Sequence, residues 1–71
     1  MNTAQTDEII EYIRLPEVLR ISGLSSATIY RMAGGGKFPR QVKVGEQAVA
    51  WVRSEVMQWA TNRAAMRKQA Q

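Results

Sequence analysis

Apolar residues recur three or four positions apart near the start of the chain, a spacing that places side chains on one face of a helix. Leu15 and Val18 belong to such a stripe, and the pattern predicts a first helix over Pro16–Ser22. Proline suits a first helical turn because its φ angle is already helical. Gly23 then stands where a left-handed residue commonly ends a helix.

A second helix is predicted directly after the short connection Gly-Leu-Ser. Ser25 can cap this helix by accepting an amide hydrogen from its first turn. Ile29, Met32 and Ala33 share one face, and the glycine run 34–36 ends the helix because consecutive glycines destabilise a helical turn. Two helices joined so closely have the spacing of a helix-turn-helix.

The pattern then changes to the alternation that is typical of strands. Residues 41–44 and 47–52 read as the two strands of a hairpin, and Gly45–Glu46 suits a two-residue turn. With that turn, Val42 would face Val49 on the core side of the hairpin. This hairpin would form the wing of the domain.

A third helix is predicted from residues 53–55, which supply a cap candidate, Ser54, and an acidic first turn. Its apolar stripe contains Val56, Trp59 and Ala60. The expected fold class is therefore α+β, mainly α: a small winged helix-turn-helix with three helices and a β-hairpin wing.

The chain is 71 residues long, which is enough for one domain. We expect an N-terminal arm over residues 1–11 that is disordered, a folded domain over 12–62, and a basic C-terminal tail over 63–71 that frays because little of it is apolar. The short run Ile9–Ile13 could be either a frayed strand or part of a turn.

Charge is unevenly distributed along the chain. The net charge is +4, but Met1–Ile13 carries three acids and no base, so residues 14–71 hold ten bases against three acids, or +7. Such an excess on a small domain predicts a polyanion as the partner, in the first place double-stranded DNA. The competing interpretation is a basic surface that serves only solubility.

Several other classes of function are disfavoured by composition. The chain has no cysteine and no histidine, so it lacks disulfides and the usual nitrogen and sulfur ligands of metals, and we expect no cofactor and no enzymatic activity. No apolar run approaches the roughly 20 residues that span a bilayer, and a polar, acidic N-terminus is unlike a signal peptide. We expect a protein of the cytoplasm, associated with the nucleoid and without membrane contact. The run Gly-Gly-Gly-Lys lacks the spacing of a phosphate-binding loop.

The second helix is the one suited to the major groove, because its outward face is polar, aromatic and basic. Its candidate DNA contacts are Ser25, Ser26, Ala27, Thr28, Tyr30 and Arg31. Tyr30 could instead pack into the core. On and beside the wing, the candidates are Lys37, Arg40, Lys43 and Gln47, since a glycine-tipped hairpin can approach the backbone or the minor groove.

Over Arg14–Trp59 the sequence resembles the AlpA family of phage and mobile-element transcriptional regulators. The motifs that carry the resemblance are Gly23-Leu24-Ser25, Thr28-Ile29-Tyr30-Arg31, Gly36-Lys37-Phe38-Pro39, Val42-Lys43-Val44-Gly45, Ala48-Val49-Ala50-Trp51 and Ser54-Glu55-Val56. The resemblance implies a compact winged helix-turn-helix like those of MerR-type proteins and excisionases. It also implies recognition-helix contacts at Ser26, Thr28, Tyr30 and Arg31 and wing contacts at Lys43 and Gln47.

This chain departs from the family pattern at a few positions. Gly34 and Gly35 replace residues that are usually polar or charged, Gln41 replaces a common proline, and Gln47 stands where a base is frequent. We therefore expect the second helix to carry specificity and the wing to add contacts to the DNA backbone.

The leading hypothesis is a sequence-specific transcriptional regulator, an activator, of a prophage or integrative element that acts on integrase or excision genes. One alternative is an excisionase-like directionality factor that bends attachment-site DNA. A second is a protein-interaction module that uses the third helix and the basic tail. Expected partners besides DNA are a second copy, as a dimer or a cooperative array, and an integrase, because one small module reads few bases.

Overall fold

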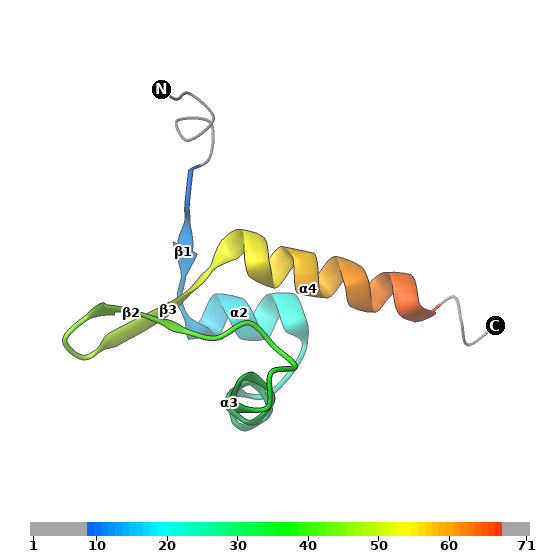
Figure 1. Ribbon diagram of the computed structural model, residues 1–71, viewed down its shortest axis with the longest axis horizontal. Coiled ribbons are helices and arrows are strands. Elements are labelled where there is room, and N and C mark those ends of the chain that lie inside the picture. The colour runs from blue at the N-terminus through cyan, green and yellow to red at the C-terminus, as the bar shows by residue number, and fades with distance from the viewer. Residues whose placement is uncertain (1–8, 68–71) are drawn as a thin grey trace.

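The computed structural model describes residues 9–67, so residues 1–8 of the predicted arm and 68–71 of the predicted tail lie outside the described part. Within residues 9–67, three helices and three short strands follow one another. They are β1 (Tyr12–Ile13), α2 (Leu15–Ser22), α3 (Ser26–Gly34), β2 (Val42–Gly45), β3 (Ala48–Val52) and α4 (Arg53–Met66). The prediction of a small α+β winged helix-turn-helix is confirmed. The hairpin of β2 and β3 projects from the helices on the side opposite the far end of α4 (Figure 1).

The three strands form one antiparallel sheet in the order β1-β3-β2. Tyr12 pairs with Val52, and Ile13 pairs with Trp51. The short run before α2, for which the sequence left a strand and a turn open, therefore contains a strand. This strand adds a third strand to the predicted hairpin.

The register of the hairpin differs from the predicted one. Val42 pairs with Ala50 and Lys43 with Val49, so Val42 and Val49 do not face each other as expected. Gly45 pairs with Ala48, and the ladder is irregular between Lys43 and Gly45. An irregularity of this kind takes up one extra residue in one strand. The turn consequently moves from Gly45–Glu46 to residues 46–47.

Both predicted boundaries between α2 and α3 are confirmed. Gly23 ends α2 in the left-handed conformation with φ 76°, and its amide donates to the carbonyl of Leu19. Ser25 caps α3, since its hydroxyl accepts the Thr28 amide hydrogen at 3.3 Å. The helix takes in Gly34 before the remaining glycines end it.

The start and the end of α4 correct two predictions. Val52, and not Ser54, is the capping residue, and no side chain caps this end. The amide of Arg53 instead donates to the carbonyl oxygen of Glu11 at 2.8 Å, which ties α4 to the segment before α2. The helix continues to Met66, past Asn62, after which the sequence predicted a frayed tail. None of the helices within residues 9–67 is long and apolar enough to span a bilayer.

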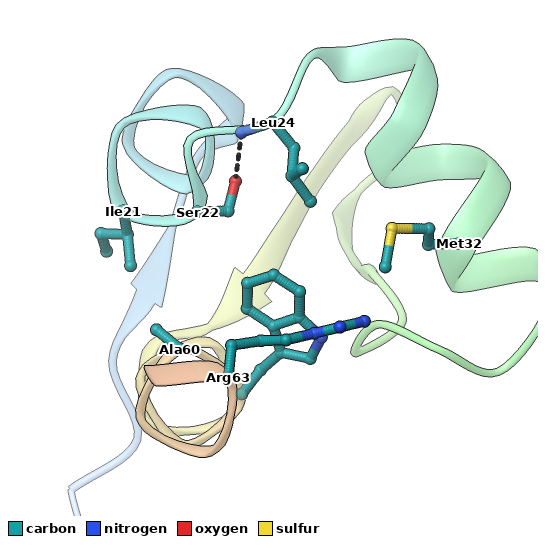
Figure 2. Close-up of a pocket in the computed structure, with 7 residues that line it drawn as sticks. Ile21, Ser22, Leu24, Met32, Ala60 and Arg63 are labelled. Atoms are coloured by element: carbon teal, nitrogen blue, oxygen red, sulfur yellow. Dashed lines mark hydrogen bonds between the residues drawn. The ribbon is translucent and has the colours of Figure 1, made fainter. Parts of the chain in front are cut away.

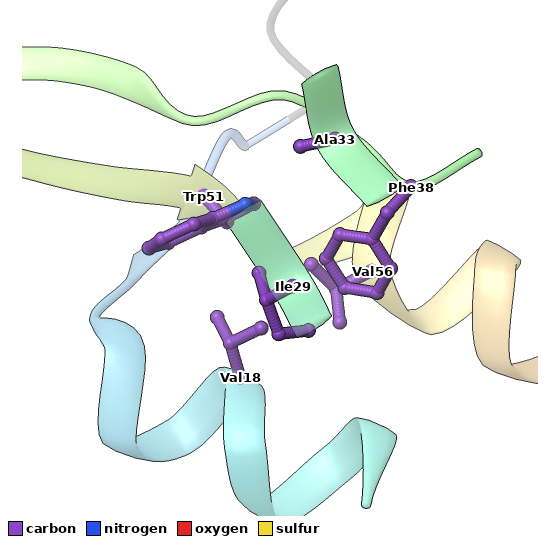
Figure 3. Packing of buried hydrophobic residues seen from close by; sticks show 6 residues of the cluster. All are labelled: Val18, Ile29, Ala33, Phe38, Trp51 and Val56. Atoms are coloured by element: carbon purple, nitrogen blue, oxygen red, sulfur yellow. The ribbon is translucent and has the colours of Figure 1, made fainter. Parts of the chain in front are cut away.

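One core joins the helices to the sheet. Its buried members are Val18, Ile29, Ala33, Phe38, Trp51 and Val56, which point toward one another in Figure 3. The indole nitrogens of the two tryptophans donate to the connector between α3 and β2: Trp51 to the carbonyl of Pro39 at 3.1 Å and Trp59 to that of Lys37 at 3.0 Å. These bonds satisfy the polar atoms of two large side chains and hold the connector against the core.

Candidate nucleic-acid interface

The outward face of α3 is exposed along its first two turns. Ile29 and Ala33 are buried beneath the helix, whereas Ser26, Ala27 and Arg31 are exposed to solvent. This division follows from the helical period, because the apolar residues of α3 recur on one side. The face therefore presents small polar groups and one guanidinium at the surface.

Two of the predicted contacts are already engaged at the start of α3. The Ser25 hydroxyl donates to the Thr28 hydroxyl oxygen at 3.0 Å while accepting the Thr28 amide hydrogen. Thr28 is also half-buried. Ser25 and Thr28 consequently stabilise the helix start, which keeps Ser26 and Ala27 in position between them.

Tyr30 combines the two alternatives that the sequence left open. The residue is 41% exposed, yet its ring lies 5.8 Å from that of Trp51, measured between ring centroids, with an angle of 59° between the planes. Such a tilted arrangement is favourable for an aromatic pair. Tyr30 thus links the exposed face of α3 to the sheet that carries the wing.

The predicted wing residues occupy different places. Lys43 lies in β2, exposed and opposite Val49, and Gln47 lies in the turn at the tip beside the acidic Glu46. Arg40 is exposed just before β2. The basic residues of the wing, Arg40 and Lys43, lie before and within β2, whereas the tip carries the Glu46 carboxylate. A carboxylate repels phosphate, so β2 is better suited than the tip to contact the DNA backbone.

Lys37 is separated from the start of α3. It follows the C-terminal end of that helix, its amide donates to the carbonyl of Met32, and its own carbonyl accepts from Trp59 of α4. The structure therefore brings the residues of the first turns of α3 together, and it places Lys37 at the other end of the helix.

Most of the other arginines have partners within the protein. Arg20 forms an ion pair with Glu17, and Arg53 lies 3.8 Å from a carboxylate oxygen of Glu11. The hydrogen bond and charge of Arg20 lower the pKa of Glu17, and Glu17 in turn raises the pKa of Arg20. Arg63 lies over the Trp59 ring, 5.2 Å from its centroid.

Arg14 was not among the residues predicted for the site. Its Nε donates to the backbone carbonyl oxygen of Val49 at 3.1 Å, so it ties the start of α2 to strand β3 of the wing. The sequence does hold a signal here, because a cation at the residue that precedes a helix is unfavourable for the helix dipole. An arginine at such a position therefore indicates a role other than stabilising the helix.

A pocket of about 450 Å³ lies between the end of α2, α3 and α4. Its lining is mainly apolar and includes Leu24, Met32, Ala60 and Arg63, which face one another across it in Figure 2. The Ser22 hydroxyl in its wall accepts the amide hydrogen of Leu24 at 3.1 Å. None of the residues predicted to contact DNA lines this pocket.

A helix pair joined by a capped turn, followed by a hairpin that projects beside the second helix, defines a small winged helix-turn-helix protein. The chain belongs to the AlpA family: the family described as "Prophage CP4-57 regulatory protein (AlpA)" matches residues 11–64. The resemblance read from the sequence motifs is thereby confirmed.

The chain is similar to a phage protein and to a bacterial protein. The ORF88 protein of Enterobacteria phage P4 is 47% identical over 57 residues, which cover 80% of this chain and 65% of that protein. The DNA-binding transcriptional activator AlpA of Escherichia coli K12 is 28% identical over 60 residues, which cover 76% of this chain and 86% of that protein. The chain thus spans somewhat less than two thirds of the phage P4 relative.

Proposed function

We propose that the protein is a DNA-binding transcriptional regulator that places α3 in the major groove with the hairpin alongside. The observation that carries this proposal is the exposed face of α3, where Ser26, Ala27 and Arg31 stand above a buried apolar side. A capped helix N-terminus with small side chains can approach base edges closely. The E. coli relative, which is a DNA-binding transcriptional activator by name, supports the same class.

The roles of the individual side chains follow from their chemistry. Ala27 is small enough to meet a thymine methyl group, and Arg31 can bind a guanine edge or a phosphate. The Tyr30 hydroxyl can donate to a backbone oxygen. The proposed contact set is Ser25, Ser26, Ala27, Thr28, Tyr30 and Arg31 of α3 and its cap, with Lys37, Arg40, Lys43 and Gln47 outside that helix.

The biological target is proposed from kinship. Relatives in a phage and in a family of prophage regulators support a regulator of a prophage or integrative element, acting as an activator on integrase or excision genes. One copy buries little DNA surface and reads few bases, so we propose that two or more copies bind together. An integrase is a further proposed partner, and the cytoplasm, at the nucleoid, is the proposed location.

The dependence of affinity on salt tests the DNA-binding proposal. Fluorescence anisotropy with a labelled duplex of the neighbouring genomic DNA gives the dissociation constant between low and physiological salt. If about four cations neutralise phosphates, log affinity falls against log salt with a slope of roughly −3.6. A flat response would overturn the proposal and favour a protein-interaction role.

Arg31→Ala tests whether α3 reads sequence. Loss of a base contact costs about 1 to 3 kcal/mol of binding on the target duplex and less on a scrambled one. Arg20→Ala is the matched control, because it removes the same charge from an arginine that is paired with Glu17. Equal losses on both duplexes for Arg31→Ala would assign that residue to a phosphate.

Footprinting separates regulation from recombination. A single protected site at a promoter is expected for the proposed regulator. Tandem sites within an attachment region, with marked bending of the DNA, would instead identify a directionality factor.

A further inference from the structure

We propose that Arg14 and Lys43 form a phosphate-binding site at the junction of α2 and the wing, which grips the DNA backbone without reading sequence. The inference rests on the proposed DNA-binding function. It adds Arg14, which belongs neither to the recognition helix nor to the hairpin.

The first argument is that the guanidinium of Arg14 is held in place. Its Nε donates to the carbonyl of Val49 at 3.1 Å, across 35 positions of sequence, while the side chain stays exposed. A guanidinium has five N–H donors in a rigid plane, so fixing one of them leaves the two Nη groups directed and able to donate. Such an arrangement lowers the entropy that is lost when an anion binds.

The second argument is that the charge of Arg14 is not compensated by its partner. The partner of Arg14 is a neutral carbonyl, whereas Arg20 and Arg53 approach carboxylates. Within residues 9–67, neither Arg14 nor Lys43 has an acidic group at ion-pair distance. The junction therefore keeps a net positive charge that is available to an anion from solution.

The third argument is the position of the junction between the recognition helix and the wing. Val49 of β3 lies opposite Lys43 of β2, and its carbonyl oxygen accepts from Arg14, which directly follows β1 on the other side of β3. The two cations therefore flank the same strand. Trp51 lies two positions further along β3, on the same face as Val49, and its ring contacts Tyr30 of α3. Successive neighbours therefore lead from α3 to the junction. Tyr30 of α3 contacts Trp51 of β3, and Val49 of the same strand lies opposite Lys43 of β2.

In a duplex that contacts both α3 and the wing, the sugar-phosphate backbone passes the junction between them. Arginine suits the oxygens of a phosphate because its planar donors match them in pairs, and lysine adds a mobile point charge. Contacts of these two groups with phosphate oxygens carry no information about the base sequence. The expected contribution is therefore affinity without specificity.

The experiment compares Arg14→Ala with wild type on two 24-base-pair duplexes of unrelated sequence, by anisotropy over a range of salt. The expected result is an affinity about 5 to 10 times lower on both duplexes, with the salt slope reduced by about 0.9, as for one lost phosphate contact. Lys43→Ala should behave in the same way. Arg20→Ala, the matched control, should leave both affinity and slope unchanged.

A second variant separates binding from folding. Arg14→Lys keeps the charge but loses the Nε donor to Val49, so it should retain the wild-type salt slope while Arg14→Ala does not. Thermal melts by circular dichroism report the structural contribution separately. If both variants lower the melting temperature and neither changes the slope, Arg14 is only a structural tie and the inference is overturned.

The outcomes also distinguish this inference from the proposed function. If the wild-type protein shows no salt-dependent binding to DNA, both the proposed function and the phosphate-binding site are overturned. Wild-type binding that is weakened by Arg31→Ala but has the same slope with Arg14→Ala would remove the phosphate site alone.

Discussion

At the scale of single residues, two glycines at the ends of successive helices have opposite requirements. Gly23 has φ 76°, a left-handed conformation that other residues adopt at a cost, whereas Gly34 belongs to the last turn of α3 and has open space where a Cβ would stand. We predict that Gly23→Ala lowers the free energy of unfolding by about 1 kcal/mol or more. Urea denaturation followed by circular dichroism measures the change.

The matched control is Gly34→Ala, which makes the same chemical change in a helical position. It should leave stability unchanged or raise it by up to about 1 kcal/mol, because alanine restricts the unfolded chain. Equal losses for both variants would contradict the conformational explanation. The caps at Gly23 and Ser25 could be predicted from sequence because their chemistry lies within three or four residues of chain.

At the scale of elements, sequence predicted the helices better than the sheet. The hairpin itself was expected, but its register depended on which residues form the turn, and Gly45 was assigned to the turn when it ends β2. Strand β1 pairs with residues about 40 positions away, so nothing in its local pattern could decide between strand and turn. Long-range pairing of this kind is set by packing and not by local propensity.

The contribution of β1 can be measured with two isoleucines. Ile13 packs against the core beside Trp51, while Ile10 is 61% exposed. Ile13→Ala should lower the free energy of unfolding by about 2 kcal/mol through lost burial, and Ile10→Ala should change it by less than about 0.5 kcal/mol. Thermal and urea melts of both variants give the comparison. A similar loss for both would mean that β1 does not anchor the domain through Ile13.

At the scale of the whole molecule, the proposed site combines residues of α3, which the sequence could group, with Arg14, which it could not. The α3 face was predictable because Ser26, Ala27 and Arg31 follow one helical period. For Arg14 the sequence holds only the indirect signal of a cation before a helix, because its hydrogen bond to Val49 exists only once the start of α2 and β3 have come together. Arg14 thus joins the proposed site through a contact between residues far apart in the sequence, which helical periodicity cannot indicate.

The pH dependence of stability also belongs to the whole molecule. The chain has no histidine, so no side chain with an ordinary pKa near neutrality changes charge, and we expect a constant melting temperature between about pH 5.5 and 7. Arg20 lowers the pKa of Glu17 in the folded protein. The ion pair therefore stabilises the fold above the pKa that Glu17 has when unfolded, and this stabilisation is lost as the pH falls through the folded value.

Glu17→Gln and Arg20→Gln each remove one of the two charges of the ion pair between Glu17 and Arg20. Both variants should melt below wild type at neutral pH, and the difference should shrink as the pH falls into the acidic range, because protonation removes the same interaction from wild type. Melting curves by circular dichroism between pH 7 and about pH 3 measure the convergence. A difference that stays constant over this range would mean that the two substitutions act through helix propensity, because protonation of Glu17 removes every interaction that depends on its charge.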